Sequence, residues 1–136
     1  MNGGLCKVLV VDDEPDLVES LTEGLQAQGY QVITAADGVA AVNAARSEKP
    51  NLILLDLMLP LLDGFRILKL LKTDERYRGI PIIVVTARAN AEDWTLAMEC
   101  GADGWLTKPV KMDELLEKMR AVAVNKRVER ILRHES

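Results

Sequence analysis

The chain has 136 residues, a net charge of −4 and 49% apolar residues, a composition typical of one domain with a core of its own. No apolar run approaches the roughly 18 residues that cross a bilayer, and residues 1–5 lack the basic and apolar segments of a secretion signal. Cys6 and Cys100 lie too far apart to form a CxxC pair or a metal-binding spacing. We therefore expect a single cytoplasmic domain without a membrane segment.

Charge is distributed unevenly along the chain. The negative total argues against direct contact with nucleic acid, because phosphate backbones are bound largely by Lys and Arg. Between residues 124 and 136, however, four basic residues and two acids leave a charge of +2, against −6 for the rest. We expect a flexible N-terminus at 1–5, the main domain at 6–122 and a C-terminal helical extension at 123–136.

Five short β-branched or aliphatic runs predict strands, each followed by a helical pattern of apolar residues. The strands are predicted at 7–11, 31–35, 52–55, 80–86 and 104–107. The helices are predicted from Pro15 to a stop at Gly29, at 39–47, at 65–72, at 90–100 with Asn90 as cap, and from about Met112. Because strands and helices alternate, we expect an α/β doubly wound fold, with a five-stranded parallel sheet and helices on both faces.

Polar side chains stand at the ends of four predicted strands. Asp12 and Asp13 follow the first strand, Asp56 the third and Lys108 the fifth, and Thr86 ends the fourth. Sites in open α/β sheets form outside the carboxyl ends of the strands, near the switch in strand order. These three carboxylates, one hydroxyl and one ammonium are therefore expected at one edge of the sheet.

Three neighbouring carboxylates repel one another unless a cation lies among them. An all-oxygen set without a nearby His or Cys favours Mg²⁺, and Lys108 adds a second positive charge. A metal, a lysine, a hydroxyl and one exposed carboxylate suit a phosphoryl group. Asp56 is then the candidate nucleophile, forming an aspartyl phosphate, while Mg²⁺ and Lys108 neutralise charge on the phosphoryl oxygens.

Four stretches of the chain resemble the receiver domain of bacterial two-component response regulators. They read VLVVDDEPDLVESL, LILLDLMLPLLDG, IIVVTARA and GADGWLTKPV, and the resemblance runs from Cys6 to Val122. It implies a flavodoxin-like fold with strand order 2-1-3-4-5, similar to the chemotaxis regulators, and a receiver domain over residues 6–122. It also implies that Asp56 is the phosphoacceptor.

The resemblance implies roles for further residues around Asp56. Asp13 would bind Mg²⁺ directly, Asp12 largely through water, and Asp56 and the backbone carbonyl of Met58 would be further ligands. Lys108 would contact the phosphoryl group and precede a cis peptide bond to Pro109.

Two further positions would form the switch. The resemblance implies that Thr86 moves toward the phosphoryl group and that Trp105, which stands where Tyr or Phe is more usual, rearranges with it. The expected function is a phosphoacceptor switch in a phosphorelay, without conventional enzyme turnover. Its expected partners are a sensor histidine kinase or a histidine phosphotransfer protein, followed by a downstream protein or an output domain.

Two rival functions use the same features differently. One is a receiver-like binding module that works without phosphorylation, which the complete set of acids, Thr86 and Lys108 disfavours. The other is a haloacid-dehalogenase-type phosphatase, which also uses an aspartyl nucleophile at a strand end. That class requires a second Asp two residues later, where this chain has Met58.

The last two predicted helices carry apolar side chains that could be exposed to partner proteins. Trp94 shares a helical face with Ala97 and Met98, so we expect it to be partly buried. In the final helix one stripe (Met112, Leu115, Leu116, Met119 and Val122) faces the sheet, and a second (Val124, Val128, Ile131 and Leu132) points away. The second stripe indicates either a solvated tail, or a helix that forms a homodimer or leads into an output domain.

Overall fold

The computed structural model describes residues 6–88 and 90–135, apart from the side chains of 124 and 126–135. Within these residues the strands are β1 (Lys7–Val11), β2 (Gln31–Ala35), β3 (Leu52–Leu55), β4 (Ile82–Thr86) and β5 (Gly104–Thr107). The helices are α1 (Pro15–Ala27), α2 (Gly38–Glu48), α3 (Gly64–Thr73), α4 (Ala91–Glu99) and α5 (Met112–Glu135). The predicted flexible N-terminus, 1–5, lies outside the described residues.

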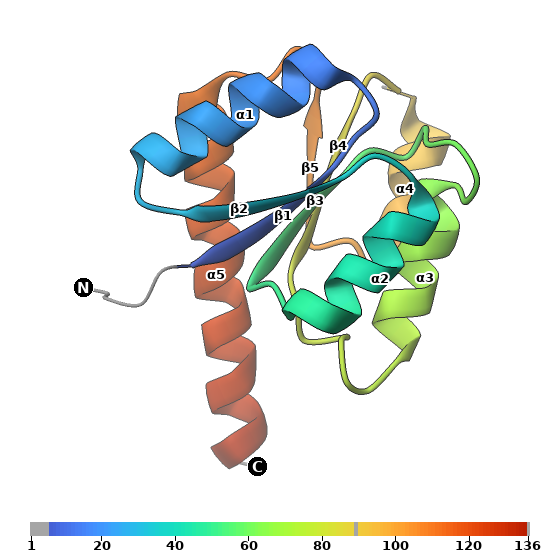
Figure 1. The fold of residues 1–136 in the computed structure, drawn as a ribbon. Helices are drawn as coiled ribbons and strands as arrows, with labels where there is room; N and C mark the ends of the chain where they lie inside the picture. The colour runs from blue at the N-terminus through green and yellow to red at the C-terminus, as the bar shows by residue number, and fades with distance from the viewer. Residues whose placement is uncertain (1–5, 89, 136) are drawn as a thin grey trace.

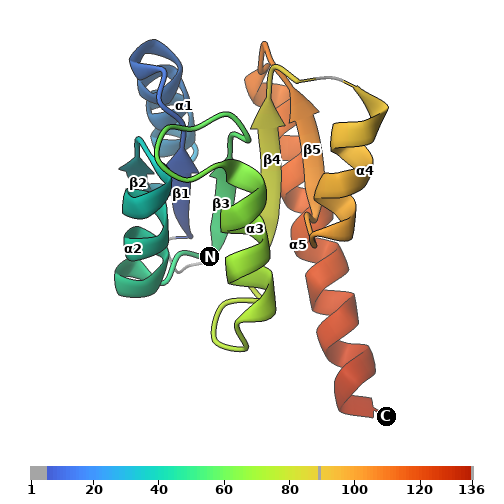
Figure 2. The same ribbon diagram turned by 90° about the vertical axis from the view of Figure 1, so that its right-hand side faces the viewer.

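The strands form one parallel sheet in the order β2-β1-β3-β4-β5. Helices α1 and α5 cover one face, and α2, α3 and α4 cover the other (Figures 1 and 2). This arrangement confirms the predicted doubly wound, flavodoxin-like fold. The order changes direction between β1 and β3, so the carboxyl ends of these strands border the crevice where such folds bind ligands.

The apolar runs of the strands are unbroken because both faces of the sheet are covered. In β1, Leu9 and Val11 pack with α2, α3 and α4, whereas Val8 and Val10 pack with α1 and α5. All four side chains are almost completely buried. The two resulting cores hold the sheet between the helix layers, and only the strand ends present polar side chains.

Polar caps fix where three helices begin. The side chains of Asp37, Asp63 and Asn90 accept hydrogen bonds from the backbone N–H groups of Ala40, Arg66 and Asp93, at 2.8, 3.1 and 2.8 Å. Such caps satisfy N–H groups that have no partner within the helix. The cap predicted at Asn90 is confirmed.

Two local predictions were wrong. Strand β4 begins at Ile82 and not at Ile80, because the N–H of Ile80 closes a turn by donating to the carbonyl of Tyr77. Trp94, predicted to be partly buried, is 49% exposed. The buried position of α4 is taken by Ala97, whose small side chain brings the helix close to the sheet and leaves the larger indole at the rim.

Helix α5 continues past the end of the sheet (Figure 2). Its first stripe packs as predicted, with Leu115, Met119 and Val122 buried against β1, β3 and β4. The second stripe, from Val124 to Leu132, lies outside the residues whose side chains are described, so its pairing stays a prediction. Within the described residues, no helix combines the length and apolar character needed to cross a membrane.

Candidate functional site

The acids meet at the carboxyl edge of the sheet. Strands β1 and β3 pair in register, Val11 beside Leu55, so the residues that follow them, Asp12 and Asp56, lie next to each other. Both are only 4% exposed, while Asp13 is exposed. Carboxylate oxygens of all three lie within 4.8 Å of one another. The structure therefore brings the three predicted carboxylates together.

Lys108 binds this cluster from the end of β5. Its Nζ donates to Asp12 Oδ2 at 2.8 Å and to Asp56 Oδ2 at 2.9 Å, and it also pairs with the carboxylate of Glu14. The Lys108–Pro109 peptide bond is cis, as predicted, and the Lys108 N–H donates to the carbonyl of Thr86. One cation thus connects strands β1, β3 and β5.

Burial and pairing oppose each other in this cluster. Burial raises the pKa of Asp12, and the hydrogen bonds from Lys108 and from the Glu14 N–H offset only part of that effect. For Lys108, burial alone would lower the pKa, but hydrogen bonds to Asp12, Glu14 and Asp56 raise it above its ordinary value. The ammonium therefore stays charged at neutral pH. It is a single positive charge that faces several carboxylates.

The donor set around Asp56 suits a divalent cation. Asp56 Oδ1 accepts a hydrogen bond from the Met58 N–H at 3.0 Å, so the loop after β3 folds back over the carboxylate. Among the described residues, the carboxylate of Asp13 has no ion-pair or hydrogen-bond partner. Three carboxylates with one cation leave negative charge in excess, and an all-oxygen site of this kind fits Mg²⁺.

Gly64, the first residue of α3, allows this loop to fold tightly. A Cβ atom at this position would lie 2.5 Å from Leu57 Cα and 2.6 Å from the carbonyl oxygen of Asp56. The Gly64 N–H donates to the carbonyl of Leu57. Helix α3 therefore begins directly against the backbone that carries Asp56.

The predicted switch residues lie on the neighbouring strands. Thr86, at the end of β4, is completely buried, and its Oγ1 accepts a hydrogen bond from the Arg88 N–H at 3.3 Å. Trp105 is partly buried on β5, and its indole N–H donates to Thr107 Oγ1 at 3.2 Å. A rearrangement that turns the indole away from Thr107 would break this contact.

Sequence reasoning missed two charged contacts at the site. Glu14 pairs with Lys108, although its position after Asp12 and Asp13 made it an ordinary member of an acidic helix start. Arg88 Nε pairs with Asp93 Oδ2 at 2.7 Å, and its guanidinium lies 5.8 Å from the centre of the Phe65 ring. The Glu14–Lys108 and Arg88–Phe65 contacts join segments that are far apart in the sequence, and the local Arg88–Asp93 pair depends on how the loop after β4 turns into α4, so no spacing predicts them.

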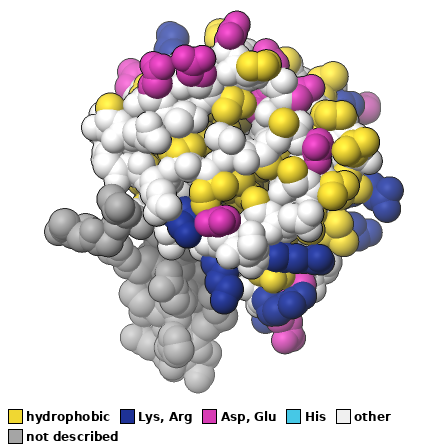
Figure 3. All heavy atoms as spheres, in the orientation of Figure 1, with side chains coloured by type: hydrophobic (Ala, Val, Ile, Leu, Met, Phe, Trp, Pro, Cys, Tyr) yellow, Lys and Arg dark blue, Asp and Glu magenta, His cyan; other side chains and the backbone are white. Residues whose placement is uncertain are grey.

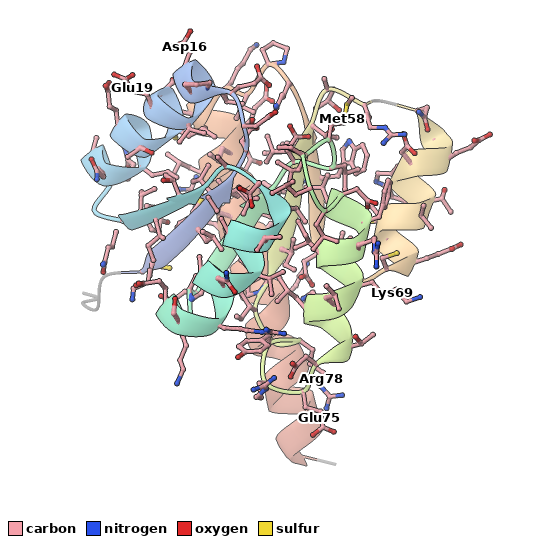
Figure 4. All side chains as sticks on the ribbon, turned by 45° about the vertical axis from the view of Figure 1, so that its right-hand side comes forward. Asp16, Glu19, Met58, Lys69, Glu75 and Arg78 are labelled. Atoms are coloured by element: carbon pink, nitrogen blue, oxygen red, sulfur yellow. The ribbon has the colours of Figure 1, made fainter. Side chains whose placement is uncertain are left out.

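These groups define what the site can do chemically. It presents a carboxylate nucleophile at Asp56, a charged donor at Lys108 and an oxygen set for a metal, at one end of the molecule. In Figure 4, Met58 marks this end, and in Figure 3 many of the acidic side chains lie along it. Transfer of a phosphoryl group to Asp56 needs this combination.

Comparisons with known proteins point to one family. The model of the response regulator receiver domain matches residues 8–120. The chain is 41% identical, over 85% of its length, to the DNA-binding response regulator MtrA of Mycolicibacterium smegmatis. It is 44% identical, again over 85%, to the alkaline phosphatase synthesis transcriptional regulatory protein PhoP of Bacillus subtilis. The matched regions cover 49% and 48% of these relatives, so the chain spans about half their length.

Solved structures share the fold over nearly the whole chain. A CheY-like receiver domain protein from Methanospirillum hungatei superposes with a TM-score of 0.85 at 31% identity, covering 93% of this chain and 99% of that one. The chemotaxis protein CheY4 of Vibrio cholerae gives a TM-score of 0.83 at 33% identity, covering 88% and 99%.

Proposed function

Because the chain belongs to the response regulator receiver domain family, we propose that it is a phosphorylation-controlled switch with Asp56 as its phosphoacceptor. The observation that carries this proposal is the position of the Asp56 carboxylate. It lies 2.9 Å from Lys108 Nζ and within 4.8 Å of two further carboxylates, at the end of a buried strand. Response regulators receive phosphoryl groups from histidine kinases, so a kinase or a histidine phosphotransfer protein is the donor.

In the proposed reaction, an oxygen of Asp56 attacks the phosphorus atom of a donor phosphohistidine. The new O–P bond forms as the P–N bond breaks, and the imidazole nitrogen leaves with the electron pair. Mg²⁺, when bound, would supply positive charge that offsets the repulsion between the carboxylates and the incoming phosphoryl group. Asp13 would hold Mg²⁺ directly, Asp12 largely through water, and Asp56 and the backbone carbonyl of Met58 would be the other protein ligands.

Lys108 and Thr86 act on the phosphoryl oxygens. The ammonium of Lys108 already contacts Asp56, so it reaches an oxygen of a phosphoryl group bound there and stabilises its charge. The Thr86 hydroxyl would turn toward the same group, giving up its bond from the Arg88 N–H. Trp105 would then rearrange on β5, changing the surface that a partner reads.

The output of the switch lies outside the site. Two relatives are named as a DNA-binding regulator and a transcriptional regulatory protein, and the chain spans about half of each. We propose that this receiver acts on a downstream protein or an output domain, without touching nucleic acid itself. It would work in the cytoplasm, and would catalyse only its own phosphorylation and dephosphorylation.

The two rival functions are less well supported. A binding module that works without phosphate does not need the buried cluster of Asp12, Asp56 and Lys108, which burial makes costly to maintain. A phosphatase of the haloacid-dehalogenase type needs an acid where the chain has Met58. The family match likewise favours the receiver.

One experiment tests the proposal. The full chain is incubated with acetyl phosphate and Mg²⁺, and separately with beryllofluoride, while intact mass and tryptophan fluorescence are followed. We expect one phosphoryl adduct on the wild-type chain, none on Asp56→Asn, and none when EDTA removes the metal. The tryptophan fluorescence should change only in samples in which Asp56 is phosphorylated or binds beryllofluoride.

Asp63→Asn is the matched control. Asp63 is a carboxylate of the same loop, and asparagine keeps its capping bond to the backbone of α3, so this variant should react like wild type. The absence of an Asp56-dependent adduct would refute the switch. Steady release of phosphate from many monoesters would instead support the phosphatase.

A further inference from the structure

A second site lies at the opposite end of the sheet from Asp56. A pocket of about 620 Å³ opens between the loop before β3 and the connection from α3 to β4, lined by Lys49, Pro50, Arg76, Tyr77 and Ile80. In Figure 4, Glu75 and Arg78 of that connection lie at the end of the molecule away from Met58. The pocket is therefore separate from the phosphorylation site.

The polar lining consists of hydrogen-bond donors. Lys49 and Arg76 are cationic, Tyr77 carries a hydroxyl, and no carboxylate lines the pocket. Among the described residues, Lys49 makes no ion pair and the Tyr77 hydroxyl makes no hydrogen bond. Asp74, which does not line the pocket, pairs with Arg76 and offsets one of the two positive charges. The remaining positive charge favours an anionic ligand.

Arg76 presents one edge of its guanidinium group for such a ligand. Its Nε and Nη2 donate to the two carboxylate oxygens of Asp74, at 3.1 and 2.9 Å. The guanidinium also lies over the Tyr77 ring, 5.0 Å from its centre, which limits its orientation. The Nη1 group has no partner among the described residues, so the Nη1–Nη2 edge is available for the two-point contact that phosphate oxygens make with arginine.

Lys49 occupies a strained backbone position at the rim. Its φ is 48° and its ψ is 61°, a left-handed conformation that glycine or asparagine adopts at lower cost. Lys49 is the C-cap of α2, and helices commonly end with a residue in this conformation. The end of α2 thus places Lys49 at a pocket that Arg76 also lines.

We infer that this pocket binds a small phosphate-bearing molecule of about the size of a mononucleotide. Arg76 and Lys49 contact the phosphate, Tyr77 donates a hydrogen bond, and Pro50 and Ile80 pack against the apolar or planar part. The volume falls within the range of about 300–1,000 Å³ typical of small-molecule sites. The inference does not depend on the proposed function of Asp56, because no residue is shared between the two sites.

Titration of the full chain with AMP tests the inference. Isothermal titration calorimetry at low ionic strength should show saturable binding of one AMP with a dissociation constant below about 1 mM. Adenosine, which lacks the phosphate, should not bind measurably, and inorganic phosphate should bind more weakly than AMP. The absence of saturable AMP binding, or equal binding of adenosine, would overturn the inference.

Variants locate the ligand. Arg76→Ala and Lys49→Ala should each weaken AMP binding about tenfold, because each removes a charged hydrogen bond. Asp74→Asn should leave binding unchanged or tighten it, since it removes a neighbouring negative charge and keeps Arg76. Arg78→Ala, a cation of the same connection that does not line the pocket, should change binding less than about threefold.

Two controls test whether the variants fold normally and whether AMP binds independently of Asp56. Circular dichroism should show the same melting temperature for Lys49→Ala as for wild type, so a loss of binding in this variant reports the lost contact. Asp56→Asn should bind AMP normally, which separates the result from that of the phosphorylation test. AMP binding that neither Arg76→Ala nor Lys49→Ala weakens would place the ligand elsewhere and refute this pocket.

Discussion

Lys108 neutralises part of a buried acidic cluster. Its side chain is 11% exposed, and those of its partners Asp12 and Asp56 are 3% and 5% exposed. Removing one member of a buried ion pair costs more than the pair itself contributes, because the remaining charge has lost its partner. Lys108 therefore supports folding of the site as well as the proposed transfer.

We expect Lys108→Met to lower the free energy of unfolding in EDTA by about 2–4 kcal/mol. Millimolar Mg²⁺ should restore part of the loss, because a cation bound only by the folded state stabilises it. Urea denaturation with and without Mg²⁺ measures both effects. Lys111→Met, an exposed cation nearby, is the control and should lie within about 0.5 kcal/mol of wild type. Equal stability of Lys108→Met and wild type in EDTA would contradict this role.

The pKa of Asp12 predicts a pH effect of definite sign. Burial raises this pKa above its value in the unfolded chain, so the folded state binds more protons and loses stability as pH rises above about 4. Lys108 keeps Asp56 and Glu14 as partners when Asp12 is replaced. Asp12→Asn should therefore be more stable than wild type at pH 7 in EDTA, with the difference shrinking toward pH 4. Thermal unfolding across this range provides the measurement. If the stability difference between Asp12→Asn and wild type grew as the pH fell, folding would lower the pKa of Asp12 instead of raising it.

At the scale of the element, strands and helix starts were the most predictable features. Unbroken runs such as Leu52 to Leu55 are buried on both faces, and caps such as Asn90 satisfy N–H groups locally. The exposure of Trp94 could not be predicted, because helical spacing gives a direction but not the depth to which a helix sits on the sheet. Contacts such as Glu14 with Lys108 depend on two elements meeting, which single-sequence patterns do not contain.

The start of α3 gives a test at this scale. Gly64→Ala should lower the free energy of unfolding by about 1–3 kcal/mol, because its Cβ would press on the backbone of Asp56 and Leu57. It should also slow phosphorylation by acetyl phosphate, since the loop carrying Asp56 must shift. Urea denaturation and the intact-mass assay give the two results.

Gly79→Ala is the matched control for this substitution. A Cβ at Gly79 would meet nothing within 4 Å, so the variant should unfold within about 0.5 kcal/mol of wild type and react at the same rate. Equal effects of the two substitutions would mean that the close approach at Gly64 has no energetic consequence.

At the scale of the whole molecule, the two ends of the sheet have different chemistry. The carboxyl edge gathers acids around Lys108, and the opposite edge places Arg76 and Lys49 at a pocket. Strand β3 begins next to the pocket of Lys49 and Arg76 and ends next to Asp56, and both of its faces are buried. The two sites therefore lie at opposite ends of this strand and share no residue.

The last prediction concerns the part of α5 that follows Val122. Among the side chains that the structure describes, Val122 is the last of α5 in the core, so we expect a chain cut after it to have a free energy of unfolding within about 1 kcal/mol of the full chain. If the stripe from Val124 to Leu132 pairs with a second copy, the full chain should sediment faster as concentration rises, while the cut chain stays monomeric. Analytical ultracentrifugation measures this directly. Identical monomeric sedimentation of both chains would refute the homodimer, and unfolding of the cut chain would show that the domain extends beyond residue 122.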